Sequence, residues 1–380
     1  MGGFPERPRE ATNPIFNANR LKLGVFGLNG AGTVMTRHPD RFIPTWEASL
    51  QVAQIADAAG FEALVPYSRW KPFGDAGHIS GATLDTFAWA AGVGASTSGA
   101  GVFSTCHTPT LHPLIVAKQG ATIDQITGGR FALNVVVGWF IPEMEAFGVD
   151  AAAHAERYDQ ADEWITAVKR LWTEGEEVDV DGRFVQMRGG VSMPKPVQRP
   201  LPPIMNAGGS ERGRQFAAKH ADVAFVVISD DDPAAIRAQV DSYKRLARDD
   251  YGRDIQVWAY ALVIQRPTVE EAQAAYHDYA VTHADEAAID VFLDFQVRNT
   301  SGMPPEAVSR LRLAIAGGGG VQLFGPPEAI ADRLQMLSDC GLDGILLTFV
   351  DYAKGMAQFA AAVSPLLEAA GLRQPRGAGA

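Results

Sequence analysis

Short apolar segments recur along this chain and alternate with segments that have the period of an α-helix. Eight of them have the length of a strand, at residues 21–27, 62–66, 101–105, 131–137, 203–207, 223–228, 257–264 and 344–349. They are rich in Val, Ile, Leu, Phe and Ala and do not alternate strictly with polar residues, which is typical of strands buried on both faces. Eight strands, each followed by a helix, predict an α/β fold, the (β/α)8 TIM barrel. A doubly wound open sheet is the alternative, but eight alternations filling one chain favour closure.

Three segments interrupt the alternation and define the expected domain plan. Residues 1–20, rich in Pro, Arg and Asn, are expected to form an exposed N-terminal arm, and residues 21–371 a single barrel domain. Residues 175–202 follow the fourth helix and are predicted to form a small hairpin insertion. A longer insertion around the seventh helix, at 285–322, ends in four consecutive glycines, and a connection of that length is typically a lid or a disordered segment. The tail, 372–380, is expected to fray.

Composition excludes several classes of protein. The formal net charge of −11 argues against nucleic acid or an anionic membrane surface as a main partner. No apolar run approaches the ~20 residues of a membrane span, and the first twenty residues contain no apolar signal-peptide core. The two cysteines, Cys106 and Cys340, fit a reducing cytoplasm rather than a disulfide framework.

In a TIM barrel, ligands bind where the carboxyl ends of the strands meet their loops. The turn at Gly208, Gly209 and Ser210 occupies such a position and opens a helix. Glycines allow close backbone approach, and free N–H groups of a first helical turn favour an anion such as a phosphate. The alternative is an ordinary N-cap, because Ser is a favoured capping residue. Arg157 and Tyr158 are further phosphate candidates, although a surface ion pair and a packed ring explain them equally well.

Other polar residues occupy the ends of the third and fourth strands. Asn134 lies inside an apolar strand, so its amide needs partners, either a ligand or the barrel backbone. Thr105 has the same two interpretations. His107 is the one histidine at a strand end and is therefore the best acid–base candidate. No histidine or cysteine spacing matches a metal site, so no metal is predicted.

Four motifs carry a family resemblance. They are ATIDQITGGRFALNVVVGW at 121–139, HAERYDQADEW at 154–164, NAGGS at 206–210 and DGILLTFVDY at 343–352. Through them the chain resembles the bacterial luciferase-like, flavin-dependent monooxygenases over residues 21–367. Within these it is most similar to the branch that holds pyrimidine monooxygenase, dimethylsulfone monooxygenase and alkanesulfonate monooxygenase.

The resemblance implies a function and a set of partners. It implies a two-component monooxygenase that uses reduced FMN and dioxygen to oxygenate and cleave a C–N or C–S bond in a small heterocyclic or organosulfur substrate. A separate NAD(P)H-dependent flavin reductase would supply the reduced FMN, and a homodimer or homotetramer is expected. A deazaflavin-dependent oxidoreductase that transfers hydride on the same barrel is the first alternative function, and a non-catalytic flavin-binding or storage protein is the second.

The resemblance also implies roles for residues. Thr105 and Asn134 match residues that contact the flavin ring and dioxygen, and Glu143 matches a flavin contact. The phosphate and ribityl contacts match Arg157, Tyr158, Gly209 and Ser210, and the flavin face matches Pro66 and Tyr67.

Two departures from the family concern the substrate and the third strand. The loop at 66–78, PYSRWKPFGDAGH, is this chain's own, so Arg69 and Trp70 are expected to shape the substrate pocket. Trp139 is a further candidate wall for a planar ligand. His107 stands where the pyrimidine branch has a small residue.

Overall fold

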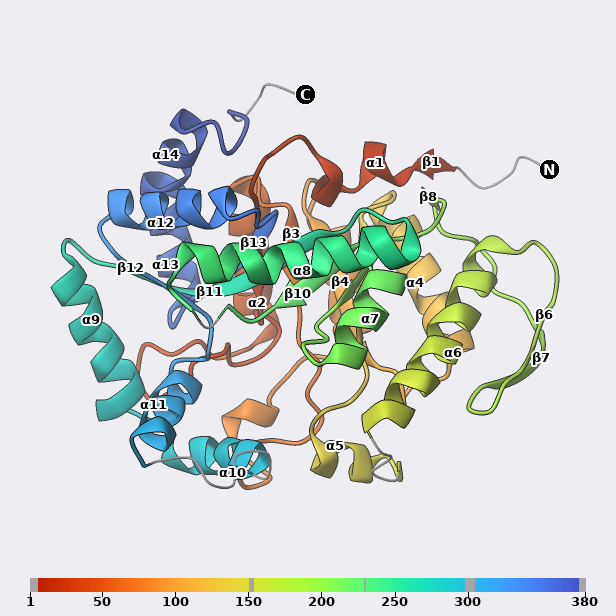
Figure 1. The fold of residues 1–380 in the computed structure, drawn as a ribbon, viewed down its shortest axis with the longest axis horizontal. Coiled ribbons are helices and arrows are strands. Elements are labelled where there is room, and N and C mark those ends of the chain that lie inside the picture. Colours follow the sequence, from red (N-terminus) through yellow and green to blue (C-terminus); the bar gives the residue numbers. More distant parts are fainter. Residues whose placement is uncertain (1–5, 150–153, 229, 298–304, 376–380) are drawn as a thin grey trace.

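Eight parallel strands close into a barrel in the computed structural model, which describes residues 6–149, 154–228, 230–297 and 305–375 (Figure 1). In order around the barrel they are β2 (Lys22–Phe26), β3 (Ala63–Val65), β4 (Gly101–His107), β5 (Phe131–Val136), β9 (Ile204–Asn206), β10 (Val223–Val226), β11 (Gln256–Gln265) and β13 (Gly344–Thr348). Parallel pairing of β13 with β2 and of β10 with β11 completes the ring. The predicted TIM barrel is confirmed, and each strand lies within one of the eight expected segments or extends it by no more than two residues.

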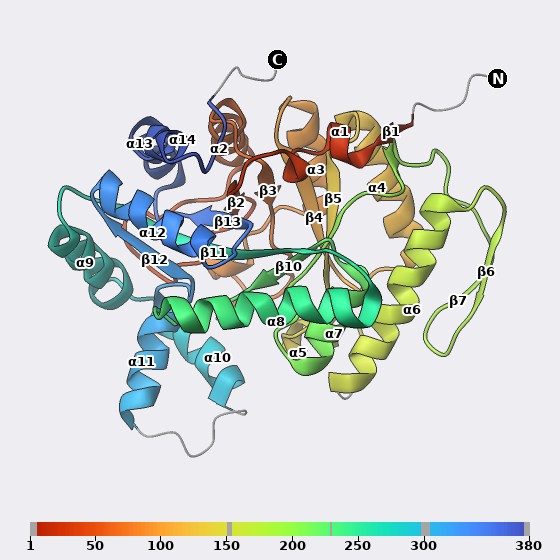
Figure 2. The ribbon, with the colours of Figure 1, turned by 45° about the horizontal axis from the view of Figure 1, so that its top comes forward.

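Helices surround the barrel, as the alternation requires (Figure 2). They are α2 (Trp46–Ala58), α3 (Thr86–Ala95), α4 (Pro113–Thr127), α6 (His154–Thr173), α7 (Glu211–His220), α8 (Pro233–Tyr251), α12 (Pro327–Asp339), α13 (Tyr352–Ala362) and α14 (Ser364–Ala369). Gly128 ends α4 with a φ of +66°, a left-handed conformation that favours glycine.

The strands are apolar on both faces because the barrel has two cores. One lies between the strands and the helices. The other fills the interior of the barrel with fully buried side chains from different strands, among them Phe103, Met205, Trp258 and Leu346. This second core explains why the strand segments lack polar alternation.

The N-terminal arm is not exposed along its length, so that expectation is wrong. It forms β1 (Arg7–Pro8), α1 (Arg9–Thr12) and a short 3-10 helix, Pro14–Phe16, and β1 pairs in parallel with β8 (Gln198–Arg199). Ile15 is fully buried and belongs to the core inside the barrel. A closed barrel leaves the apolar ends of its interior side chains uncovered at the amino ends of the strands, and Ile15 covers them.

The tail also begins as ordered structure rather than frayed chain. Leu372 and Arg373 are buried, and Arg373 Nη1 lies 2.7 Å from Glu62 Oε2. The Glu62 carboxylate also accepts hydrogen bonds from Asn17, Asn19 and the Leu23 N–H. One buried carboxylate therefore joins the arm and the tail at the amino end of the barrel. The last five residues, 376–380, lie outside the described residues.

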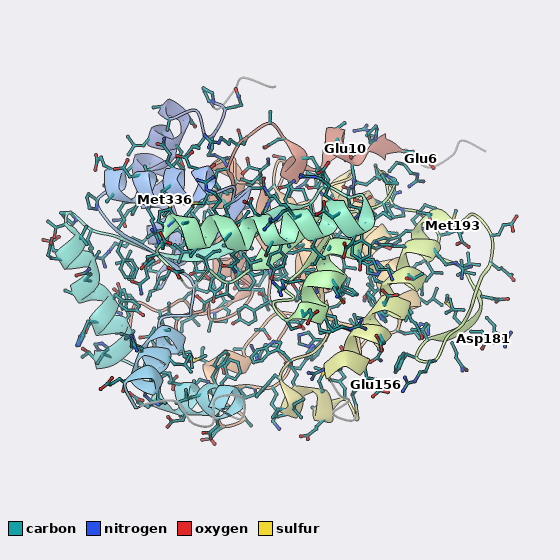
Figure 3. The ribbon with its side chains drawn as sticks, in the orientation of Figure 1. Glu6, Glu10, Glu156, Asp181, Met193 and Met336 are labelled. Atoms are coloured by element: carbon teal, nitrogen blue, oxygen red, sulfur yellow. The ribbon has the colours of Figure 1, made fainter. Side chains whose placement is uncertain are left out.

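The first insertion is the expected hairpin. Strands β6 (Val178–Asp181) and β7 (Gln186–Gly190) pair in an antiparallel sheet of their own. The hairpin projects from the barrel at the edge of the molecule, where Asp181 is labelled (Figure 3).

The second insertion is helical and contributes a strand that the sequence did not predict. Helix α9 (Val269–His277) and a π-helical turn, Asp278–Thr282, precede the insertion, which contains α10 (Glu286–Val297) and α11 (Pro305–Ala316). Strand β12 (Val321–Gly325) then pairs in parallel with the last five residues of β11, Ala261–Gln265. Because β11 has ten residues and outruns its neighbours, its free edge can accept a further strand. The part of the insertion at 298–304 lies outside the described residues.

The insertion lies at the end of the barrel where a ligand is expected. Helices α10 and α11 lie on the same side as α5 (Ile141–Ala146), which follows β5, and opposite the two termini (Figure 1). This position fits the predicted lid. Among the described residues, no helix is long and apolar enough to cross a membrane.

Candidate functional site

Thr105 and Asn134 form a buried polar pair on neighbouring strands. They face each other in the pairing of β4 with β5, and Asn134 Nδ2 donates to Thr105 Oγ1 over 3.1 Å. Thr105 Oγ1 in turn donates to the Pro66 carbonyl oxygen over 2.5 Å. The structural interpretation of Thr105 is therefore confirmed, because its hydroxyl proton serves the protein backbone. Its contact with a ligand stays a prediction.

These contacts determine the orientation of the Asn134 amide. A carbonyl oxygen can only accept, so the Thr105 hydroxyl must donate to Pro66 and must accept from the amide nitrogen of Asn134. Asn134 Oδ1 is then buried without a hydrogen-bond partner among the described residues. A buried acceptor without a partner costs roughly 1–3 kcal/mol, so this oxygen is suited to accept from a ligand N–H.

His107 and Glu143 form a second buried pair beside the first. His107 Nδ1 lies 3.2 Å from Glu143 Oε2, an ion-pair distance whose angles fall outside regular hydrogen-bond geometry. The other carboxylate oxygen accepts from the Trp70 N–H and, over 3.3 Å, from the Lys71 N–H. Burial raises the pKa of Glu143, but His107, the Trp70 N–H and the charge of Arg69 outweigh it, and the pKa lies below its usual value. Glu143 is thus an ionised carboxylate that holds the 66–78 loop against β4.

The side chain of Arg69 extends from that loop into a cage of aromatic rings. Its guanidinium carbon lies 4.0 Å from the centre of the Phe73 ring, 5.2 Å from Trp139 and 5.7 Å from Phe140. Trp70, by contrast, is half-exposed, and its ring meets the edge of Phe147 instead. The structure therefore brings Arg69 and Trp139 together and leaves Trp70 in a different cluster. The role of these residues in a substrate pocket stays a prediction.

Tyr67 packs beside the end of β2, and its hydroxyl also interacts with the charge of Arg69. Its backbone is held from both sides by the Asn29 side chain, over 3.0 and 2.9 Å. Its ring packs against Gly27 and leaves no room for a side chain at Gly30. Burial raises the pKa of Tyr67 to about 12, so its hydroxyl stays protonated.

The predicted phosphate residues also meet. Ser210 is the N-cap of α7 and accepts from the Gly213 N–H over 3.1 Å, so the capping interpretation is confirmed. Burial raises the pKa of Tyr158, opposed by a hydrogen bond with Ser210 and the charge of Arg157. A Cβ at Gly213 would lie 2.5 Å from the Tyr158 hydroxyl, which shows how closely α6 approaches the start of α7. Gly209 is exposed and has open space around it, as access to the backbone of this turn requires.

Three aromatic rings at the inner face of the barrel were not predicted. Phe26, Phe225 and Tyr260 contact one another with ring centres 5.3–6.0 Å apart, on strands β2, β10 and β11. They pack above the core inside the barrel. Strand position alone could have suggested them, because inward-facing positions near a strand end are the ones that meet a bound ligand.

The described residues contain one cluster with metal-ligand chemistry, His38, Asp278 and His283. His38 is far in sequence from Asp278 and His283, so no local spacing motif could reveal the cluster. The Asp40 N–H donates to His38 Nδ1 over 3.1 Å, which leaves the proton of a neutral ring on Nε2, the atom that faces Asp278. In that protonation state His38 is a hydrogen-bond donor to Asp278 rather than a metal ligand, so the structure gives no reason to add a metal to the site.

Two surface hollows lie away from the two buried pairs. One of about 240 Å³ lies between α7 and α8 and is lined by Glu211, Arg214, Gln215, Ser242 and Leu246. The other, of about 50 Å³, lies beside the end of β11. Neither is lined by a member of the Thr105–Asn134 or His107–Glu143 pair.

Comparison with known proteins agrees with this geometry. The profile of the Luciferase-like monooxygenase family matches residues 21–344. The pyrimidine monooxygenase RutA of Escherichia coli O127:H6 is 30% identical over 355 residues, which cover 92% of this chain and 96% of that protein. RutA of Acinetobacter baylyi is 29% identical over 353 residues, which cover 91% and 95%.

Solved structures give the same result at the level of the fold. The riboflavin lyase RcaE, in a crystal structure with modified FMN and its substrate riboflavin, superposes with a TM-score of 0.81 at 26% identity, over 93% of this chain and 92% of that one. The long-chain alkane monooxygenase LadA superposes with a TM-score of 0.82 at 23% identity, over 94% of each chain. The chain therefore belongs to the luciferase-like monooxygenase family, and the expectation of a flavin-dependent monooxygenase is confirmed.

Proposed function

We propose that the protein is a two-component monooxygenase that receives reduced FMN from a separate NAD(P)H-dependent flavin reductase. With dioxygen it would oxygenate and cleave a C–N or C–S bond in a small heterocyclic or organosulfur substrate. The observation that carries this proposal is the unpartnered Asn134 Oδ1, buried at the carboxyl end of a barrel of this family. The pyrimidine monooxygenase relatives make pyrimidines the first substrates to screen.

The residues present fit FMN at two separate places. Asn134 Oδ1 would accept from an N–H of the flavin ring, and Pro66 and the ring of Tyr67 would lie beside that ring. The turn at Gly209 and Ser210, at the start of α7, would hold the phosphate with Arg157 and Tyr158. The modified FMN in the riboflavin lyase structure supports the choice of FMN among flavins.

The protein's own contribution to the reaction would be positioning, exclusion of water and proton handling. Reduced flavin, when bound, supplies the electrons and the reaction with dioxygen. The Glu143 carboxylate favours the proton of His107 on Nδ1, so Nε2 carries the lone pair, and it makes no hydrogen bond within the described residues. His107 Nε2 is therefore the atom that would accept a proton, and Thr105 and Asn134 would orient the groups beside it.

The decisive experiment mixes the purified protein with chemically reduced FMN without oxygen and then admits oxygen. The return of oxidised-flavin absorbance is followed, together with product from a pyrimidine screen. We expect a rate of flavin reoxidation that differs from that of free FMN and reaches a limit as the protein concentration is raised. Reoxidation at the rate of free FMN, with no product from any substrate, would contradict the proposal and favour the deazaflavin alternative, in which hydride transfer consumes no oxygen.

A further inference from the structure

The guanidinium of Arg69, a residue that is partly buried as a whole, has buried donors without a hydrogen-bond acceptor. Its Nε and Nη1 atoms are buried and have no partner, and Nη2 makes no hydrogen bond to any residue that the structure describes. Buried polar groups are nearly always hydrogen-bonded, and a buried charge without a partner costs more than a neutral group. The chain therefore maintains an incomplete site at this position.

The aromatic cage stabilises the charge but does not use the donors. The guanidinium carbon lies within reach of cation–π attraction to the Phe73, Trp139 and Phe140 rings. Ring faces accept no regular hydrogen bond, and the Nε and Nη1 donors have no other acceptor. The cage thus stabilises the charge of Arg69 while these donors stay available.

Glu143, the nearby carboxylate, makes no ion pair with Arg69 among the described residues. Its Oε1 atom accepts from the Trp70 and Lys71 N–H groups, and its Oε2 atom lies 3.2 Å from His107 Nδ1. Burial lowers the pKa of Arg69, opposed by the charge of Glu143, and arginine remains protonated even so.

The lid covers the same cage. Phe292 of α10 meets Phe73 and Trp139, with ring centres 5.3 and 5.5 Å apart. At the start of α10, Asp285 Oδ2 lies 2.8 Å from His78 Nε2, which ties the insertion to the loop that carries Arg69. A group bound to Arg69 would therefore be enclosed between the loop and α10.

We propose that Arg69 binds a carboxylate of the substrate, which makes the preferred substrate a planar ring compound that carries a carboxylate rather than a neutral pyrimidine. A planar guanidinium matches a planar carboxylate through two parallel hydrogen bonds, and the aromatic walls fit a flat ring. The inference rests on the proposed function, because it places the substrate beside the flavin residues. The same donors could instead bind a carbonyl oxygen of the flavin, and the experiment distinguishes a substrate carboxylate from a flavin carbonyl as the acceptor.

The test compares orotate with uracil, a matched pair that differs by one carboxylate, by calorimetric titration of the protein in the presence of oxidised FMN. The wild-type protein is expected to bind orotate at least about ten-fold more tightly than uracil. Arg69→Met should remove this preference, and Arg69→Lys should retain part of it. Arg245→Met, which removes an exposed arginine of α8, is the control for net charge.

Binding of FMN itself is measured in parallel by quenching of flavin fluorescence. A wild-type protein that binds uracil as tightly as orotate would overturn the proposal, and this comparison needs no variant to fold. If Arg69→Met weakens FMN about ten-fold and leaves the orotate preference intact, the donors serve the flavin and the proposal is also overturned. Because these titrations follow binding rather than turnover, their outcome is independent of whether the monooxygenase reaction is found.

Discussion

Asn134 is the residue on which the assignment of the site depends. One side of its amide is committed to Thr105, while Oδ1 is buried and without a partner. The sequence could indicate a polar residue in an apolar strand, but not which of its atoms was already occupied. The hydrogen bond from Thr105 to Pro66, residues on two different strand ends, decides that.

Substitution of Asn134 by Ala is expected to lower kcat by one to two orders of magnitude, because it removes a positioned polar group beside the reacting centre. FMN affinity should change much less, because the phosphate contacts lie elsewhere. Thr105→Ser, which keeps the hydroxyl, is the matched control and should stay near wild type. Steady-state kinetics measure kcat, and a fluorescence titration measures FMN affinity. If Asn134→Ala lowers both by the same factor, the assigned role is contradicted.

At Glu143 the expected effect depends on pH. Glu143→Gln removes the charge opposite His107 and should lower the free energy of unfolding by about 1–3 kcal/mol at neutral pH. The pKa of Glu143 is depressed, so its stabilising effect is complete above the value of the unfolded chain, about 4.3, and is lost as the pH falls through the lower folded value. Urea unfolding is measured for both proteins between neutral pH and the acid limit of the native state. The difference in free energy of unfolding between wild type and Glu143→Gln should become smaller only at the acid end of this range.

Among the elements, α6 and α7 hold the two halves of the predicted phosphate site together. His220 at the end of α7 lies 2.8 Å from Asp162 of α6, and Lys169 of α6 approaches His220 Nδ1 at 3.3 Å. Burial and the charge of Lys169 lower the pKa of His220 to about 4. The histidine is therefore a neutral bridge between the helices.

This bridge predicts a loss of stability in mild acid. The folded pKa of about 4 lies below the ordinary value of about 6.5, so the unfolded chain binds the proton first as the pH falls between these values. Up to about 3 kcal/mol of stability should be lost across this window. His220→Asn should make the free energy of unfolding depend less on pH in this window, whereas His277→Gln, at an exposed position of α9, should not. Denaturant unfolding at a series of pH values measures both; parallel profiles for wild type and His220→Asn would refute the bridge.

The second insertion shows where element prediction failed. Its length and glycines predicted a lid, but the sequence pattern did not reveal β12, which follows directly after the four glycines. The strand exists because β11 extends beyond the barrel and exposes an edge. Edge pairing is a tertiary event, so a local pattern cannot report it.

In the whole molecule, the predicted ligand residues and the contacts that join the two ends of the chain lie at opposite ends of the barrel. The predicted ligand residues lie at the carboxyl ends of the strands, with α5 and α10, and the chain termini lie at the other end (Figure 2). Glu62 joins the arm and the tail there through Asn17, Asn19 and Arg373.

This separation predicts that Glu62→Ala destabilises the fold by about 3–5 kcal/mol, because it leaves Arg373 buried without its partner. FMN affinity should stay at the wild-type value, as measured by titration under conditions in which the variant is still folded. Arg373→Met is the companion variant, and the double variant should cost less than the two single losses added together. Additive losses would show that the two groups act separately.

Local sequence pattern determined most of the architecture of this protein. Eight apolar segments without polar alternation can be buried only between an interior core and an outer layer of helices, and the polar residues that follow them must lie at one end of the barrel. The pattern therefore located Thr105, His107, Asn134 and Ser210 without any structural information.

Tertiary structure alone decided which groups meet and which donors remain free. The cage around Arg69, the pairing of His107 with Glu143, the burial of Ile15 and the contact of Arg373 with Glu62 join residues that are between 4 and 311 positions apart. Such contacts depend on barrel closure and on loop paths, because hydrogen-bond partners are chosen by position in space and leave no periodic trace in the chain.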